Sequence, residues 1–260
     1  MRVLIVSDIH ANLSALETVL ADAEQLEFLE QRGFEQVWCL GDIVGYGPDP
    51  NECVDRLRDF GSDHFAVAGN HDWAALGNLA VDDFNPEARR AVLWTREQLA
   101  HKTRTYLEGL PAEPQVQGEF TITHASPRHP VWEYVASPFV ARDNFDYFDT
   151  QFCLVGHTHE PRIYQWVQEE QGRGRPARCS ARAPIFDRPV DLASDERLII
   201  NPGSVGQPRD NDPRAAYALL DTEAKLIRFR RVAYPYELTQ ARMRSANLPG
   251  RLIARLSYGW

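Results

Sequence analysis

Polar clusters rich in histidine, aspartate and asparagine recur along the first 160 residues of the chain. Their members are Asp8, His10, Asp42, Asn70, His71, His124, His157 and His159. Imidazole nitrogens, carboxylates and an amide oxygen are donors that borderline transition metals accept, whereas calcium and magnesium prefer oxygen ligands. The residue types therefore indicate a transition-metal centre.

Each of these clusters comes directly after a short apolar run of the kind that forms a buried strand. The runs end in front of Asp8, Asp42, Asn70, His124 and His157. A lone Asp-x-His is weak evidence, because a turn acid beside a surface histidine explains it equally well. Several such clusters, each at the end of an apolar run, are poorly explained by coincidence.

The elements that must position these residues begin with an alternation of strand and helix patterns. Apolar runs at 3–6, 37–40 and 65–68 are separated by a helical stretch at about 13–31 and by a second one that starts at Asp49-Pro50. This βαβαβ order predicts a largely parallel sheet, whose ligand site lies outside the carboxyl ends of its strands.

The remainder of the chain predicts a second half with antiparallel strands. Asn85-Pro86 should open a long helix that reaches about residue 107, and strand patterns without long helices between them follow. These patterns lie at 162–167, 197–200, 215–221 and 226–232, after two apolar runs at 116–123 and 152–155 that end in front of histidines. We expect a four-layer α/β/β/α sandwich of two mixed β-sheets flanked by helices, in a single domain covering residues 1–260.

One segment, at about 169–195, is rich in arginine, proline and glycine and reads as an irregular insertion. We expect a mobile loop or hairpin arm there. It is either a solvated surface loop, or a substrate lid or partner-binding flap.

Composition limits the classes of function. The net charge of -9 gives no basic face for nucleic acid, so phosphate chemistry would need local cations such as metal ions. No apolar segment approaches the roughly 18 residues that cross a bilayer, and the N-terminal run lacks the features of a secretory signal. The four cysteines have no CxxC spacing. These features predict a cytoplasmic protein, with homo-oligomerisation left open.

The motifs, taken together, resemble those of a known superfamily. Asp8-x-His10, Gly41-Asp42, Gly69-Asn70-His71-Asp72, His124 and Gly156-His157-Thr158-His159 are similar to the motifs of calcineurin-like metallophosphoesterases, in the same order. The resemblance is strongest to the compact bacterial and archaeal phosphodiesterases, which Asn201-Pro202-Gly203-Ser204-Val205 also matches. Ala11 and Ala125 stand where glycine is usual; because alanine disfavours positive φ, we expect altered loop geometry rather than altered metal binding.

This resemblance implies a dinuclear site with assigned roles. Asp8, His10 and His159 would bind one divalent ion, Asn70, His124 and His157 would bind the other, and Asp42 would bridge them. Manganese is the first expectation, with iron, nickel, cobalt or zinc as alternatives. A metal-bridging hydroxide would attack a phosphodiester or phosphomonoester, and His71, off the metals, would assist the leaving group.

Residues beyond the clusters have two interpretations each. Arg128, four positions after His124, could bind a substrate phosphate oxygen or could be an exposed loop arginine. Asp72 could orient a neighbouring group or be a capping acid, and Asn12 is expected to cap the first helix. The turn at 201–206 could present N–H groups to an anion or be plain turn chemistry.

Other functions remain in competition with a small-molecule phosphodiesterase. A phosphoprotein or nucleotide phosphatase uses the same centre, and a nuclease is disfavoured by the acidic composition. A non-catalytic protein-binding scaffold of the same fold would tend to lose the leaving-group histidine or some ligands. This chain has both, so the sequence favours an enzyme.

Overall fold

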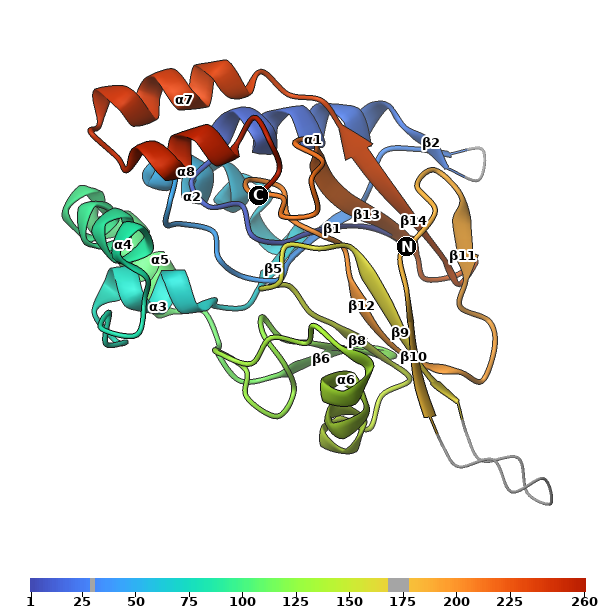
Figure 1. Ribbon diagram of the computed structural model, residues 1–260. Coiled ribbons are helices and arrows are strands. Elements are labelled where there is room, and N and C mark those ends of the chain that lie inside the picture. The colour runs from blue at the N-terminus through green and yellow to red at the C-terminus, as the bar shows by residue number, and fades with distance from the viewer. Residues whose placement is uncertain (29–30, 168–177) are drawn as a thin grey trace.

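Two six-stranded sheets form the centre of the computed structural model, which describes residues 1–28, 31–167 and 178–260 (Figure 1). The first sheet has the order β11 (Pro189–Asp191), β14 (Leu226–Val232), β13 (Ala215–Asp221), β1 (Arg2–Val6), β4 (Gln36–Cys39) and β5 (His64–Ala66). Within it β1, β4 and β5 are parallel, and β13 pairs antiparallel with β1. The predicted βαβαβ unit is therefore confirmed.

The second sheet is also mixed. Its order is β10 (Arg178–Arg182), β9 (Arg162–Val167), β12 (Arg197–Asn201), β8 (Phe152–Leu154), β7 (Phe120–Ile122) and β6 (Gln115–Gln117). Strands β7, β8 and β12 run parallel, and the other pairings are antiparallel. The antiparallel pairing predicted for the second half of the chain is confirmed for β9 with β12 and for β13 with β14, whereas β12 is parallel to β8.

Side chains alternate between the two faces of each strand and so build separate cores. On β1, Val3 and Ile5 join the cluster between the sheets, while Leu4 and Val6 join the cluster under the helices. This period of two is the geometry of an extended strand buried on both faces.

Helices cover the outer face of each sheet. The first sheet is covered by α1 (Leu13–Gln25), α2 (Pro50–Arg58) and α5 (His101–Glu108), and the second by α6 (Pro138–Asn144). The others are α3 (Asn70–Leu76), α4 (Pro86–Gln98), α7 (Tyr236–Ser245) and α8 (Gly250–Arg255). Figure 1 shows α7 beside α1, α8 next to α7, and α6 at the opposite side of the molecule. The four-layer sandwich is confirmed.

The first predicted helix is shorter than expected. It ends at Gln25 instead of continuing to about residue 31, and a small hairpin of β2 (Glu27–Phe28) and β3 (Gln31–Arg32) follows. The helix ends because Leu26 has an extended backbone (φ -67°, ψ 123°).

The long helix predicted from Pro86 to about residue 107 is two helices. The break lies at Leu99 and Ala100, where the Asn51 side chain donates to the carbonyl of Gln98 (2.9 Å) and accepts from the amide of Ala100 (2.9 Å). These bonds replace helical ones, so a residue 49 positions away ends the helix.

The segment expected as an irregular insertion at 169–195 contains regular structure. Strand β10 extends the second sheet beside β9, β11 extends the first sheet beside β14, and Leu192 is buried. Their exposed faces carry charged residues, so no apolar alternation marked them as edge strands. The part of the predicted arm at 169–177 lies outside the described residues.

Among the described residues, no helix is both long and apolar enough to span a membrane.

Candidate metal centre and comparison with known phosphoesterases

The predicted site residues lie together because parallel strands of both sheets end at one edge of the sandwich. Asp8 and His10 follow β1, Asp42 follows β4, and Asn70 begins α3 just after β5. From the second sheet, His124 follows β7, and His157 and His159 follow β8. Such an edge is where ligands bind in parallel sheets.

The backbone at this edge is unusual. Of the non-glycine residues with positive φ in the described chain, most lie at the site, and they are Asp8, His10, Ala11, Asp42, Tyr46, His157 and His159. Left-handed φ costs a residue with a Cβ about 1–2 kcal/mol. Ala11 adopts φ 50°, so this departure from the usual glycine leaves the loop in a glycine-like conformation at an energetic cost.

Hydrogen bonds between the loops stabilise this backbone. The amide of Asp8 donates to the carbonyl of Gly41 (3.0 Å), and the amide of His10 donates to that of Asp42 (2.9 Å). The amide of Gly206 donates to the carbonyl of Asp8 (3.0 Å), which ties the turn at 201–206 to the first loop. The amides of Gly203, Val205 and Gly206 are thus all engaged within the protein, which favours plain turn chemistry.

One group of donor atoms comes from Asp8, His10 and His159, whose ligand atoms lie within 4.8 Å of one another. The His10 Nε2 is 3.1 Å from the His159 Nε2, which in turn is 3.3 Å from the Asp8 Oδ1. Two ligand atoms each about 2.1 Å from one ion are about 3.0–3.4 Å apart. The spacing fits a shared metal.

A second group comes from Asp42, His124 and His157. The His124 Nε2 lies 3.3 Å from the Asp42 Oδ2 and 3.3 Å from the Asn70 Oδ1. The Asp42 Oδ2 is also 3.6 Å from the His10 Nε2 of the first group. Asp42 is thus the carboxylate that stands between the two groups.

Backbone carbonyls orient three of the imidazoles. The Nδ1 atoms of His10, His124 and His159 face the carbonyls of Val44 (3.2 Å), Leu40 (2.8 Å) and Gln207 (2.6 Å). A ring that donates through Nδ1 presents the lone pair of Nε2 to the site, as metal-binding histidines do.

Buried atoms without a partner provide the test of whether metals fit. The Asp42 Oδ2 and the His157 Nε2 are buried and lack hydrogen-bond partners. Buried polar atoms normally have one, and a carboxylate oxygen and an imidazole nitrogen left bare at one place are what a cation would satisfy. The donor set therefore fits transition-metal ions.

Electrostatics at the centre is dominated by burial and by Asp42. Burial alone would raise the pKa of Asp42, but the charges of His124 and His71 hold it well below its usual range. Burial raises the pKa of Asp8 to about 6, whereas it lowers the pKa values of His10, His157 and His159. His10, His157 and His159 are therefore neutral beside an ionised Asp42, as metal ligation requires. Burial would lower the pKa of His124, but the charge of Asp42 raises it to about 9, so this imidazole would release a proton on binding a metal.

Comparison with known proteins agrees with this geometry. The family profile described as the calcineurin-like phosphoesterase superfamily domain matches residues 1–225. The chain belongs to this superfamily. The profile covers every residue of the centre and ends before α7 and α8.

Similar proteins exist in other organisms. The uncharacterised protein MJ0912 of Methanocaldococcus jannaschii is 38% identical over 98% of this chain and 97% of its own. A metallophosphoesterase from Sphaerobacter thermophilus has a crystal structure similar to this one, with a TM-score of 0.83, 46% identity, and coverage of 100% of this chain and 99% of its own. A symmetrical bis(5'-nucleosyl)-tetraphosphatase of Pectobacterium atrosepticum is 31% identical over 38% of this chain and 37% of its own.

His71 lies beside the two groups of candidate metal ligands, as predicted from the superfamily motif. Its ring contacts those of His10, Tyr46 and Phe84, with centroid distances of 4.9, 4.2 and 5.1 Å. Its ring nitrogen also falls in a possible ligand group with His10 and Asp42, so proximity alone does not separate a ligand from a proton donor. Burial lowers the pKa of His71 to about 4.

Asp72 and Asn12 are structural residues of the phosphoesterase scaffold. The Asp72 carboxylate accepts from the amides of Gly69 (2.9 Å) and Val44 (3.0 Å), which joins the loops after β4 and β5. Asn12 accepts from the amide of Ala15 (3.2 Å), so the predicted helix cap is confirmed.

Arg128 is engaged with acidic residues. Its Nε and Nη2 donate to Glu133, and its Nη1 lies 3.7 Å from Asp143. Substrate binding by Arg128 stays a prediction, and it would require the guanidinium to leave these partners.

Sequence reasoning missed residues that border the centre. The Tyr134 ring stacks on His157 at 3.9 Å, and the Gln207 carbonyl orients His159. Arg209 carries a positive charge close enough to depress the pKa of His159, after burial. Their position in the sequence could have indicated a role at the centre. Gln207 and Arg209 lie two and four residues after the Asn201–Val205 motif that resembles the superfamily.

Proposed function

We propose that this protein is a dinuclear-metal phosphoesterase that hydrolyses phosphodiester or phosphomonoester bonds, with His71 assisting the leaving group. The observation that carries the proposal is the bare Asp42 Oδ2, buried between two groups of imidazole and carboxylate donors. Asp8, His10 and His159 would hold one ion, Asn70, His124 and His157 the other, and Asp42 both.

Two divalent ions in this position would neutralise phosphate charge and supply a nucleophile from water near neutral pH. The chain's own residues then set the orientation of the Asp42 carboxylate. The amide of His71 donates to the Asp42 Oδ1 (2.8 Å), so the carboxylate and the start of α3 move as one unit. This bond leaves the Oδ2 directed to the metal groups.

The packing and the protonation state of His71 both support a role in assisting the departing oxygen of the leaving group. Three aromatic rings restrict its orientation, and its Nδ1 is buried without a partner. The lowered pKa makes the ring neutral at pH 7 in the free protein. An arriving phosphate would raise that pKa, because negative charge favours the imidazolium.

A line of aromatic rings favours nucleotide-like substrates as the second candidate. Phe84 packs on His71, Trp132 packs on Phe84 at 5.3 Å, and Tyr134 stacks on His157. Trp132 and Tyr134 are 38% and 49% exposed, so both have free ring surface beside the centre. Bases stack on such rings. Nucleotide phosphatase activity is therefore the alternative to diesterase activity.

The test is a substrate panel across a metal series. Bis(p-nitrophenyl) phosphate, p-nitrophenyl phosphate and cyclic nucleotides would be assayed with Mn, Fe, Co, Ni and Zn, with metal analysis of the purified protein. We expect two equivalents of metal and the highest activity with manganese. A protein with both metals and no activity on any ester would favour the scaffold function.

A further inference from the structure

Two arginines meet at a single side chain beside the candidate metal centre. The Oε1 of Gln207 accepts from the Nη2 of Arg209 (3.1 Å) and from the Nη1 of Arg255 (3.1 Å). Gln207 itself is buried, with 2% exposure. A neutral amide oxygen is therefore the shared partner of two permanently positive groups.

Neither guanidinium is neutralised. Among the described residues, no carboxylate forms a salt bridge with Arg209 or Arg255, and the Nε of each is buried without a partner. Burial, and then the charge of Arg209, lower the pKa of Arg255. Two like charges at close range with bare buried donors are unfavourable unless an anion joins them.

Some partly buried arginines of this chain have carboxylate partners, whereas others, such as Arg197, donate to backbone carbonyls. Arg231 pairs with Asp210 and Asp212, and Arg242 pairs with Asp49 at 2.9 Å. Arg230 likewise pairs with Asp22 at 3.0 Å. Arg209 and Arg255 differ from all of these, because two guanidinium groups share one neutral amide oxygen, and an external anion could neutralise both.

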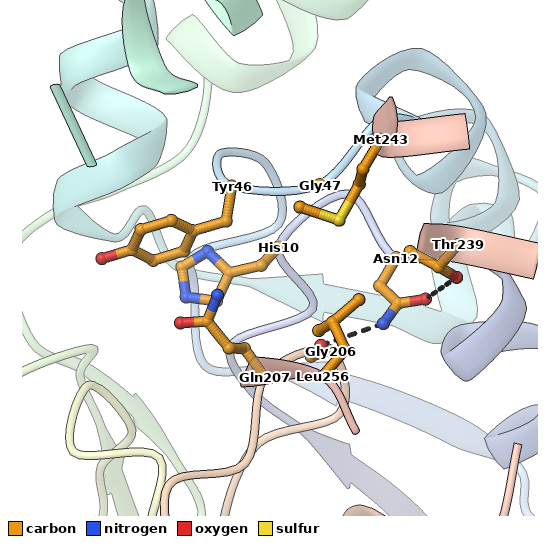
Figure 2. A pocket seen from close by; sticks show the side chains of 9 residues that line it. All are labelled: His10, Asn12, Tyr46, Gly47, Gly206, Gln207, Thr239, Met243 and Leu256. Carbon is orange, nitrogen blue, oxygen red and sulfur yellow. Dashed lines mark hydrogen bonds between the residues drawn. The ribbon is translucent and has the colours of Figure 1, made fainter. Parts of the chain in front are cut away.

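The pair lies against the centre through Tyr46 and Gln207. The Arg209 Nη2 is 3.4 Å from the Tyr46 hydroxyl, and the Tyr46 ring is 4.6 Å from the His10 ring. Figure 2 shows the Tyr46 ring and the Gln207 side chain close to the His10 ring. The cavity in that view, about 10 Å³, has room for about one water molecule, so it is too small to hold a phosphate group.

The two arginines come from different parts of the chain. Arg209 lies within the region that matches the superfamily profile, whereas Arg255 ends α8, beyond residue 225. The C-terminal helices therefore add to the common centre a cation that the shared domain does not contain. A specificity element is the kind of function such an addition serves.

We propose that Arg209 and Arg255 form a subsite for a second phosphate group, so that the preferred substrate carries a further phosphate next to the one that is hydrolysed. This rests on the proposed function, in which the metal ions hold the scissile phosphate. The planar guanidinium forks bind phosphate oxygens through two donors each. The substrate class is an ester or anhydride with at least two linked phosphates, as in nucleoside polyphosphates.

The decisive variant is Gln207→Glu. It keeps a side-chain oxygen between the arginines and adds the missing negative charge, so a purely structural bridge would be kept or strengthened. The subsite, in contrast, would be neutralised. Arg255→Gln removes one of the two cations, and Arg251→Gln is the matched control, because Arg251 lies one turn earlier on α8 with a side chain 75% exposed.

The catalytic readout compares two substrates with the metal-loaded full chain. We expect kcat/KM for diadenosine tetraphosphate to fall roughly 10- to 100-fold further than kcat/KM for bis(p-nitrophenyl) phosphate in Gln207→Glu and Arg255→Gln. Arg251→Gln should change neither value. Equal losses on both substrates, or no loss, would overturn the subsite.

A binding readout separates this proposal from the proposed function. Inorganic tripolyphosphate would be titrated calorimetrically into the metal-free full chain, where no chelation competes. We expect binding to the wild type and to Arg251→Gln, and roughly tenfold weaker binding to the other variants. Wild type without affinity for tripolyphosphate refutes the subsite, whereas binding without hydrolysis of any ester refutes only the proposed catalysis.

Discussion

The substitution Gly69→Ala tests whether the position of Asp42 controls the centre. A Cβ at residue 69 would lie 2.1 Å from the Asp42 Oδ1, 2.4 Å from its amide nitrogen and 2.7 Å from its Cγ. The φ of Gly69 is -100°, so alanine meets no backbone penalty there, and the effect is one of contact alone.

The size of the effect follows from these distances. Ordinary contacts of a Cβ begin at about 3.4 Å, so the Asp42 carboxylate must move by about 1 Å. Overpacking of this kind costs about 1–3 kcal/mol of unfolding free energy. A displacement of about 1 Å in a reacting group costs roughly 100-fold in rate, and a displaced bridge weakens the binding of both ions.

The assay combines metal analysis, urea unfolding and hydrolysis of bis(p-nitrophenyl) phosphate. Gly250→Ala is the control, because nothing lies within 4 Å of its added Cβ. We expect the control to retain metal and activity, and Gly69→Ala to lose metal and at least about 100-fold in kcat/KM while remaining folded. Full metal content and activity in Gly69→Ala would refute the bridging position of Asp42.

Three further predictions concern the ligands, the leaving group and acid stability. Asp42→Asn should lower metal content and activity together, because one oxygen serves both donor groups; retention of two metals by elemental analysis would contradict the assignment. His71→Ala should keep its metals but lose roughly 10²–10⁴ in kcat on esters with poor leaving groups, and wild-type rates there would show that His71 is no proton donor. Burial lowers the pKa of His64 to about 4, so between pH 6.5 and 4 the unfolded chain binds a proton that the folded chain does not. The resulting stability is present above pH 6.5 and falls by about 2 kcal/mol by pH 5; His64→Gln should remove this loss in urea unfolding at pH 7.5 and 5, and an unchanged loss would place its origin elsewhere.

The centre was predictable because its signals are local. Each donor follows an apolar run, so strand period and residue type together place Asp8, Asp42 and His124 at one edge of the sheets. The superfamily motifs then implied their roles. The cap at Asn12 was predictable for the same reason, since its hydrogen bond spans three residues.

Features that depend on distant partners were not predictable. The break between α4 and α5 is made by the distant Asn51. The residues at the break, Leu99 and Ala100, include no proline or glycine that would have marked it in the sequence. Strands β10 and β11 pair with the edges of sheets, so their polar sequences lack the apolar alternation of central strands. Arg255 reaches the centre only through the fold of the C-terminal helices.

The left-handed backbone of the loops has a consequence for how this protein could evolve or be engineered. Glycine would relax the positions held by Asp8, His10, Asp42, His157 and His159, where a Cβ costs about 1–2 kcal/mol each. Screens for heat tolerance of the metal-free protein should therefore enrich glycine at ligand positions and erase metal binding at the same time. Selection for thermal robustness must be carried out with metal present, so that the ions oppose the relaxation.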